Sequence, residues 1–179
     1  DRPVTVLLTS NTDQGMEILT HALSSKKFSP RINLCLDIFP FDIPEVMNQA
    51  VKQVNPAVMV LLETELWPAH LYALKKNHTT VLLINGRLSG KSSRNYRLTK
   101  AFWQSFAPER ILAVSAKDAQ RFSQVFSHTR VDIMDNIKFD RIKIQVTPDK
   151  ESALATIVPR KLPLSIFASF RRQEETQII

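Results

Sequence analysis

Cysteine is nearly absent from the 179-residue sequence, which holds one copy, Cys35. A single thiol cannot form an internal disulfide and cannot build a zinc site alone, so a reducing compartment is predicted. Cys35 stands in the apolar run 32–39, where we expect a small core residue rather than a nucleophile. The four histidines are scattered without ligand spacing, which argues against a metal site.

Long hydrophobic runs are missing as well. No apolar segment approaches the roughly 20 residues that span a bilayer, and the N-terminus lacks the pattern of a signal peptide. The chain opens on Asp1-Arg2-Pro3 without a methionine and passes at once into a strand-like segment, so we expect it to start inside a longer protein. Positive charge exceeds negative, with a formal net charge of +7. This excess favours anionic partners: nucleic acid, phosphorylated small molecules or a membrane surface.

Short apolar runs alternate with helical patterns over the first 140 residues. Strands are predicted at Val4–Thr9, Ile32–Phe39, Ala57–Glu63, Thr80–Asn85, Ile111–Ser115 and Val131–Asp135. Helices are predicted at Asp13–Ser25, Ile43–Val54, Pro68–Asn77, Ser92–Phe106 and Lys117–Phe126. Two helix starts are supported by a proline in the first turn, with Asp42 ahead of Pro44 and Trp67 ahead of Pro68. The alternation predicts an α/β fold with a Rossmann-like, doubly wound parallel sheet.

The pattern changes after Asp140. Residues 141–163 are charged and contain prolines, as expected of a linker, and residues 164–179 give one strand and the beginning of a helix. A lone strand with an unfinished helix cannot form a domain. We therefore expect residues 1–140 to form one domain and residues 164–179 to begin a second.

Ligands of doubly wound sheets bind at the carboxyl ends of the strands, where this sequence has several polar segments. Residues 63–68 (ETELWP) place Glu63 and Glu65 between a strand and a helix. One interpretation is a capped helix, since carboxylates are stabilised near a helix N-terminus. The other is a carboxylate that orients a substrate hydroxyl or stabilises an oxocarbenium-like centre.

Basic segments follow other strands. Residues 85–96 form a polar turn that resembles a phosphate-binding loop but lacks the spacing of a P-loop. Beyond it, basic and aromatic residues fall on opposite sides of a helix: Lys91, Arg94, Arg97 and Lys100 against Tyr96, Thr99, Trp103 and Phe106. The basic side is either a solvated face over a core stripe or a surface for an anion or a membrane.

Two further segments carry candidate cations. Lys138, after the last predicted strand, is either a surface lysine or a charge for a carboxylate or phosphate. Ser169 is expected to cap the final helix, whose N-terminus together with Arg171 suits a nucleotide phosphate.

Four segments, in order, resemble successive motifs of the 3-deoxy-D-manno-octulosonic acid (Kdo) transferases: 63–68 (ETELWP), 85–89 (NGRLS), 136–140 (NIKFD) and 168–175 (ASFRRQEE). The resemblance covers nearly all of the chain. It implies the N-terminal, acceptor-side half of a GT-B glycosyltransferase, whose two Rossmann-like domains face each other across a cleft. It also implies transfer of Kdo from CMP-Kdo to the lipid A precursor lipid IVA, at the cytoplasmic face of the inner membrane and without a metal or other cofactor.

The resemblance assigns roles to residues of this chain by their place in the motifs. Glu63 and Lys138 would stabilise the transition state. Residues that would bind substrate are Glu65, Asn85, Arg87, Ser89, Asn136, Ser169 and Arg171. The basic helix would suit a phosphorylated acceptor in an anionic membrane.

The sequence also departs from the family. The family's general base, a Glu in a GE-x-GE-like segment, has no counterpart here, so we expect this chain to fold but to transfer no Kdo by itself. Gly86 replaces the usual Ala, and residues 170–173 depart from a T-H-x-G pattern. Two other functions stay open: another GT-B sugar-nucleotide transferase and a basic module that binds anions or nucleic acid. Nucleic acid is disfavoured as a partner, because Tyr96 and Trp103 lie opposite the basic residues.

Overall fold

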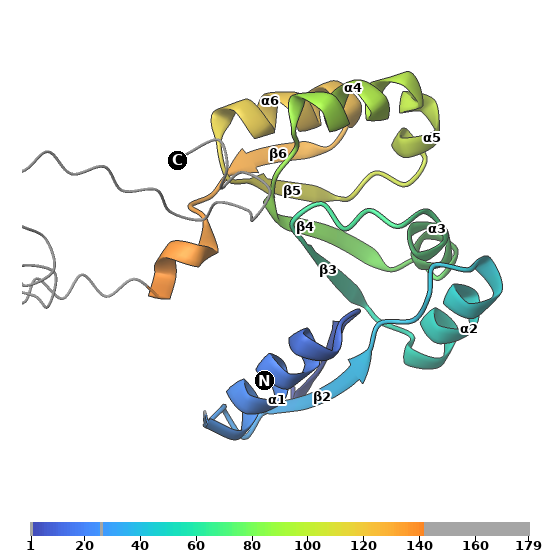
Figure 1. The fold of residues 1–179 in the computed structure, drawn as a ribbon. Helices are drawn as coiled ribbons and strands as arrows, with labels where there is room; N and C mark the ends of the chain where they lie inside the picture. The colour runs from blue at the N-terminus through green and yellow to red at the C-terminus, as the bar shows by residue number, and fades with distance from the viewer. Residues whose placement is uncertain (1, 26, 142–179) are drawn as a thin grey trace, which may run out of the picture. The chain divides into compact units, whose positions relative to one another are not determined.

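The computed structural model describes residues 2–25 and 27–141 of the chain (Figure 1). By contacts, the chain divides into two units, Asp1–Asp140 and Arg141–Ile179. Apart from Arg141, the described residues all belong to the first unit. The predicted linker beyond residue 141 and the predicted strand and helix at 164–179, with Ser169 and Arg171, lie outside the described residues and stay predictions.

Strands and helices alternate throughout the described part. The elements are β1 (Val4–Ser10), α1 (Asp13–Ser25), β2 (Ile32–Ile38), α2 (Pro44–Val54), β3 (Val58–Leu62), α3 (Pro68–Lys76), β4 (Thr80–Gly86), α4 (Gly90–Leu98), α5 (Lys100–Gln104), β5 (Arg110–Ala113), α6 (Ala116–Val125), β6 (Arg130–Ile133) and the 3-10 helix η1 (Ile137–Arg141). The predicted α/β, Rossmann-like class is confirmed.

All of the strand pairs are parallel, but the described strands form two sheets rather than the one that was expected. β1 pairs with β2, and a four-stranded sheet has the order β3-β4-β5-β6. Within the described residues, β1 and β3 each have a partner on one side alone, so no ladder joins the two sheets. Because parallel strands point the same way, β3 to β6 end at one common edge.

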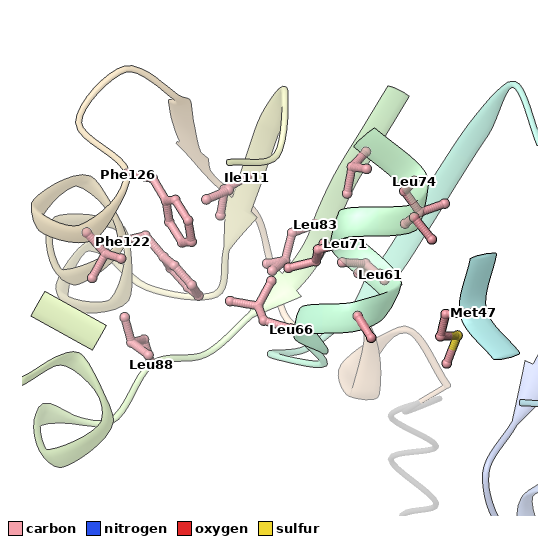
Figure 2. Close-up of a cluster of buried hydrophobic side chains, with 14 of the residues drawn as sticks. Met47, Leu61, Leu66, Leu71, Leu74, Leu83, Leu88, Ile111, Phe122 and Phe126 are labelled. Atoms are coloured by element: carbon pink, nitrogen blue, oxygen red, sulfur yellow. The ribbon is translucent and has the colours of Figure 1, made fainter. Parts of the chain in front are cut away.

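The core lies on one face of the four-stranded sheet (Figure 2). α3 packs on β4, and α6 packs on β5 and β6. The residues fully covered there include Leu71, Leu74, Leu83, Ile111, Phe122 and Phe126. Each large apolar side chain buried in this way contributes about 1.5–3 kcal/mol. This packing fixes the positions of the strands, and therefore the starting points of the loops that follow their carboxyl ends.

Asp42 caps a different helix from the one it precedes in the sequence. α2 has Ile43 as its N-cap residue, without a side-chain cap. The Asp42 carboxylate instead accepts hydrogen bonds from the backbone N–H groups of Ala69 (3.1 Å) and His70 (2.8 Å) in the first turn of α3. The cap of α3 is therefore supplied by a distant loop.

The predicted helix at Ser92–Phe106 is wrong in its continuity. The structure has two helices, α4 and α5, because Thr99 leaves the helical region with φ −113° and ψ 30°. The Thr99 hydroxyl oxygen accepts a hydrogen bond from Nε1 of Trp103 at 3.0 Å, which stabilises the break. The predicted division of faces is confirmed in part: Lys91, Arg94 and Arg97 are exposed, whereas Tyr96 and Trp103 are half-buried with ring centroids 4.8 Å apart. It is wrong for Lys100, which is half-buried, and for Thr99, which is exposed, because the helix breaks at Thr99.

The expectation of a buried Cys35 is wrong. Cys35 lies in β2 and is exposed. Its sheet has two strands, and α1, which packs on both, has no buried residue. An apolar run of this kind forms a strand without enough neighbouring structure to cover every side chain.

Candidate functional site

Glu63 stands directly after β3, at the carboxyl edge of the four-stranded sheet. Its φ of 60° is in the left-handed region, which a residue with a side chain rarely adopts. The conformation is held by the backbone N–H of Glu63, which donates to the carbonyl of Ile84 on β4 at 3.0 Å. Strained positions of this kind persist where surrounding contacts fix them, and they concentrate at ligand sites.

Lys138 lies in η1, which follows β6 at the same edge of the sheet. The side-chain oxygen of Asn136 accepts a hydrogen bond from the backbone N–H of Lys138 at 3.1 Å, and the Asn136 carbonyl accepts one from Phe139 at 2.9 Å. Asn136 thus closes the turn that starts η1. Its predicted contact with substrate remains a prediction beside this local role.

The two residues form an ion pair, with Nζ of Lys138 3.6 Å from Oε1 of Glu63. β3 and β6 are at opposite ends of the sheet order, so the segment after β6 runs back along the carboxyl edge to reach Glu63. The Lys138 and Glu63 side chains are 63% and 45% exposed. A pair this exposed contributes at most about 1 kcal/mol to stability, whereas both charges stay open to a ligand.

Asn85, near the end of β4, connects this strand to the backbone of the segment that carries Lys138. It has φ 54°, is 1% exposed, and accepts a hydrogen bond through Oδ1 from the backbone N–H of Ile137 at 3.2 Å. Its own N–H contacts Sδ of Met134 at 3.2 Å. The predicted substrate contact of Asn85 therefore concerns a side chain that the protein itself covers.

The loop after β4 is fixed by residues that the sequence motifs did not reveal. Asp118 Oδ1 accepts from the backbone N–H of Leu88 at 2.9 Å, and Nη1 of Arg121 donates to the Leu88 carbonyl at 2.8 Å. The Thr64 hydroxyl donates to the carbonyl of Arg87, which joins this loop to the one after β3. Asp118 lies three residues after Ser115, the N-cap of α6, and that spacing was the one available signal.

The other predicted site residues differ in their contacts and in their exposure. Oε2 of Glu65 accepts from Nε1 of Trp67 at 2.8 Å, and Ser89 caps α4 by accepting from the backbone N–H of Ser92 at 3.0 Å. Arg87 is exposed. Burial, and secondarily the charge of Glu65, raise the pKa of Tyr96 on α4, so Glu65 lies within electrostatic range of that helix.

In the part of the chain that the structure describes, no three His, Cys, Asp or Glu side chains gather into a cluster that could hold a metal ion. None of the helices in that same part has the length and apolar content needed to cross a bilayer.

The strands of the four-stranded sheet are parallel and end at one common edge, as in a Rossmann-like domain. The exposed Glu63–Lys138 ion pair lies at this carboxyl edge and forms a candidate ligand site. Residues 1–141 match the family described as 3-deoxy-D-manno-octulosonic-acid transferase (Kdo transferase), and the chain belongs to this family. The predicted membership of this family is thereby confirmed.

Two curated relatives illustrate the extent of the similarity. The chain is 27% identical over 144 residues to the 3-deoxy-D-manno-octulosonic acid transferase of Haemophilus influenzae, a match that covers 78% of this chain and 34% of that protein. It is 28% identical over 178 residues to the protein of the same name from Rickettsia conorii, covering 98% of this chain and 36% of the relative. The chain thus spans about a third of the length of these relatives. No solved structure matches it.

Proposed function

We propose that this chain is part of an enzyme that transfers Kdo from CMP-Kdo to a lipid A precursor, lipid IVA, in lipopolysaccharide biosynthesis. Membership of the Kdo transferase family supports this proposal. The observation that carries it is the exposed ion pair between Glu63 and Lys138, which come from opposite ends of the sheet to the carboxyl edge.

The pair suits the charges of an inverting sugar transfer. In such a reaction a base takes the proton of the acceptor hydroxyl as its oxygen attacks the anomeric carbon, and CMP leaves with the bonding electrons. Positive charge develops at the anomeric carbon and negative charge on the leaving phosphate. We propose that Glu63 stabilises the former and that Lys138 stabilises the latter or the carboxylate of the sugar. The base that takes the proton of the acceptor hydroxyl is proposed to come from a segment of the enzyme outside this 179-residue chain.

The remaining assignments are also proposals. Glu65, Arg87, Ser89, Asn136, Ser169 and Arg171 are proposed to contact or shape the substrates, with Arg171 near the donor phosphate. No metal or other cofactor is proposed, since carboxylate and ammonium groups supply the charges that this reaction needs.

We propose the cytoplasmic face of the inner membrane as the place of action. α4 carries three exposed cations (Lys91, Arg94, Arg97) and the exposed Leu98 (86%), and the next helix, α5, carries Phe102, which is 46% exposed. Cations beside exposed apolar groups suit the interface of an anionic bilayer, where the acceptor lipid resides.

The proposal is tested with the complete gene product that contains this chain, CMP-Kdo and lipid IVA. Glu63→Gln and Lys138→Ala are each expected to lower kcat by about 100-fold or more, the usual effect of losing one electrostatic contact in the transition state. Glu45→Gln and Lys52→Ala, both exposed on α2, are the matched controls and should keep wild-type rates.

Two results would contradict the proposal. If the wild-type gene product transfers no Kdo, the proposed activity is wrong. If Glu63→Gln and Lys138→Ala both keep a near-normal kcat, the proposed roles of these two residues are wrong. The 179-residue chain alone is expected to transfer no Kdo, so detectable transfer by it would contradict the proposed external base.

A further inference from the structure

We infer that Asn85 is the positioning residue of Lys138: through its buried amide oxygen it holds the segment that brings the Lys138 ammonium group to Glu63. The inference rests on the proposed function, because it assigns Asn85 a part in the same reaction. It differs from the predicted role of Asn85 in binding substrate, since the residue would act through the backbone of Ile137.

Asn85 makes two contacts with the segment that follows β6. Its backbone N–H contacts Sδ of Met134, and its Oδ1 accepts from the N–H of Ile137, both at 3.2 Å. Met134 is also tied to the end of β5, because its N–H donates to the Ala113 carbonyl at 2.8 Å. The segment is therefore fixed at both 134 and 137 before it reaches Lys138.

The other partner of the ion pair is fixed by the neighbouring residue. The N–H of Glu63 donates to the carbonyl of Ile84, which directly precedes Asn85. Two successive residues of β4 thus hold the backbones of Glu63 and of the segment that carries Lys138. A change at Asn85 is expected to move Lys138 while leaving the anchor of Glu63 in place.

Two features of Asn85 are energetically unfavourable: a buried side-chain amide nitrogen and a left-handed backbone conformation. Its Nδ2 is buried and has no hydrogen-bond partner among the described residues, and its φ is 54°. Buried amide groups without a partner are rare and destabilising, so an apolar residue would be the simpler choice for a site that served only packing. The left-handed conformation suits Asn, and the Oδ1 contact with Ile137 gives a reason for a polar side chain there.

The main variant is Asn85→Gly, because glycine adopts the left-handed conformation readily and lacks only the amide group. In the complete gene product we expect kcat to fall about 10- to 100-fold, as for a catalytic group displaced by about 1 Å, with KM values for both substrates within about threefold of wild type. Asn55→Gly is the matched control: Asn55 also has positive φ (47°) but is exposed at the C-cap of α2. It should keep the wild-type kcat.

A double-mutant cycle separates positioning from general weakening of the fold. If Asn85 acts through Lys138, adding Asn85→Gly to Lys138→Ala should lower kcat by no more than about twofold further. Ile137→Pro removes the donor of the same hydrogen bond from an exposed position at the start of η1, where proline is tolerated. It should reproduce the loss of kcat, and this variant decides the question if Asn85→Gly does not fold.

The inference is overturned if the effects of Asn85→Gly and Lys138→Ala multiply, or if Asn85→Gly behaves as Asn55→Gly does. It is also overturned if KM rises with kcat unchanged, which would indicate direct binding of substrate. A wild-type protein that transfers no Kdo overturns the proposed function itself, whereas these results in an active wild type overturn the role of Asn85 alone.

Discussion

Asp42 accepts a hydrogen bond from the backbone N–H of His70 at 2.8 Å, although the two residues belong to different βα units. The second oxygen of the same carboxylate accepts from Ala69. The loop after β2 thus satisfies two of the free N–H groups at the start of α3, the helix that follows the Glu63 loop. Asp42 thereby links the two-stranded sheet to the helix beside the candidate site.

Replacing Asp42 by Ala is expected to lower the free energy of unfolding by about 1–2 kcal/mol, the usual effect of losing an N-cap side chain. Urea unfolding of the 179-residue chain at pH 7, followed by circular dichroism, measures the change. Asp37→Ala is the control, because that exposed carboxylate accepts a hydrogen bond from the backbone N–H of the next residue and does not cap a helix. Equal stability of the two variants would contradict the capping role.

Burial lowers the pKa of His70 from 6.5 to about 4, and the charge of Asp42 offsets only part of this effect. The folded protein holds the neutral imidazole, so protons bind more readily to the unfolded chain. His70 therefore contributes its full stability above pH 6.5 and loses it as the pH falls toward 4. The loss amounts to about 2–3 kcal/mol at pH 4.5.

The pH dependence is measured by urea unfolding between pH 7.5 and 4.5. From pH 7.5 to 4.5 the unfolding free energy of wild type should fall by that amount relative to that of His70→Leu, because leucine does not titrate. His78→Asn, at an exposed position with φ 55°, serves as the control and should follow the wild-type curve. A constant difference between wild type and His70→Leu would show that His70 does not titrate in this way.

The elements that position the site were predictable because their signals are local. Each strand that carries a site residue is a short apolar run, and the prolines at 44 and 68 mark the starts of α2 and α3. The break between α4 and α5 depends on one backbone conformation, at Thr99, which no periodicity reveals.

The site was predictable only as a set of strand ends. Sequence order indicated that Glu63 and Lys138 would lie on the same edge of the sheet, but not that they would meet. Their contact depends on the path of residues 134–138, which is decided by tertiary hydrogen bonds to Asn85 and Ala113. The same is true of Asp118 and Arg121, whose contacts with Leu88 span two elements.

Gly86 is required for space rather than for conformation. A Cβ at this position would lie 2.6 Å from Cδ2 of Leu83 and 3.0 Å from Cε2 of Phe122, and both of these side chains are fully buried. The side chains of Leu83 and Phe122 therefore occupy the space that a Cβ at residue 86 would need.

Gly86→Ala is therefore expected to destabilise the chain by about 1–3 kcal/mol, as overpacking of a core does. Gly90→Ala provides the contrast, because among the described residues its Cβ would meet only Nη2 of Arg121 at 3.7 Å, an ordinary contact. That substitution, in the first turn of α4, should be neutral or stabilising by up to about 1 kcal/mol. Thermal unfolding of both variants ranks them, and a Gly86→Ala protein as stable as wild type would refute the packing argument.

The exposed basic surface of α4, formed by Lys91, Arg94 and Arg97, is expected to bind anionic membranes. Each cation near such a surface contributes about 1 kcal/mol, so replacing Arg94 and Arg97 by Gln should weaken binding by about 30-fold. Sedimentation of the 179-residue chain with phosphatidylglycerol vesicles at 0.1 M salt measures this, and vesicles of neutral phosphatidylcholine should bind little. Binding should also weaken at higher salt, because ions screen exposed charges beyond about 10 Å at 0.1 M.

The matched control replaces two exposed cations on other helices, Lys52 of α2 and Lys76 of α3, by Gln. It removes the same net charge from a chain of +7 and so separates the position of the cations from their number. If both double variants lose affinity equally, attraction is a property of the whole molecule and α4 has no special part in it. A selective loss with Arg94 and Arg97 places the membrane against the helix that begins at Gly90, directly after the loop that Thr64 joins to the Glu63 turn.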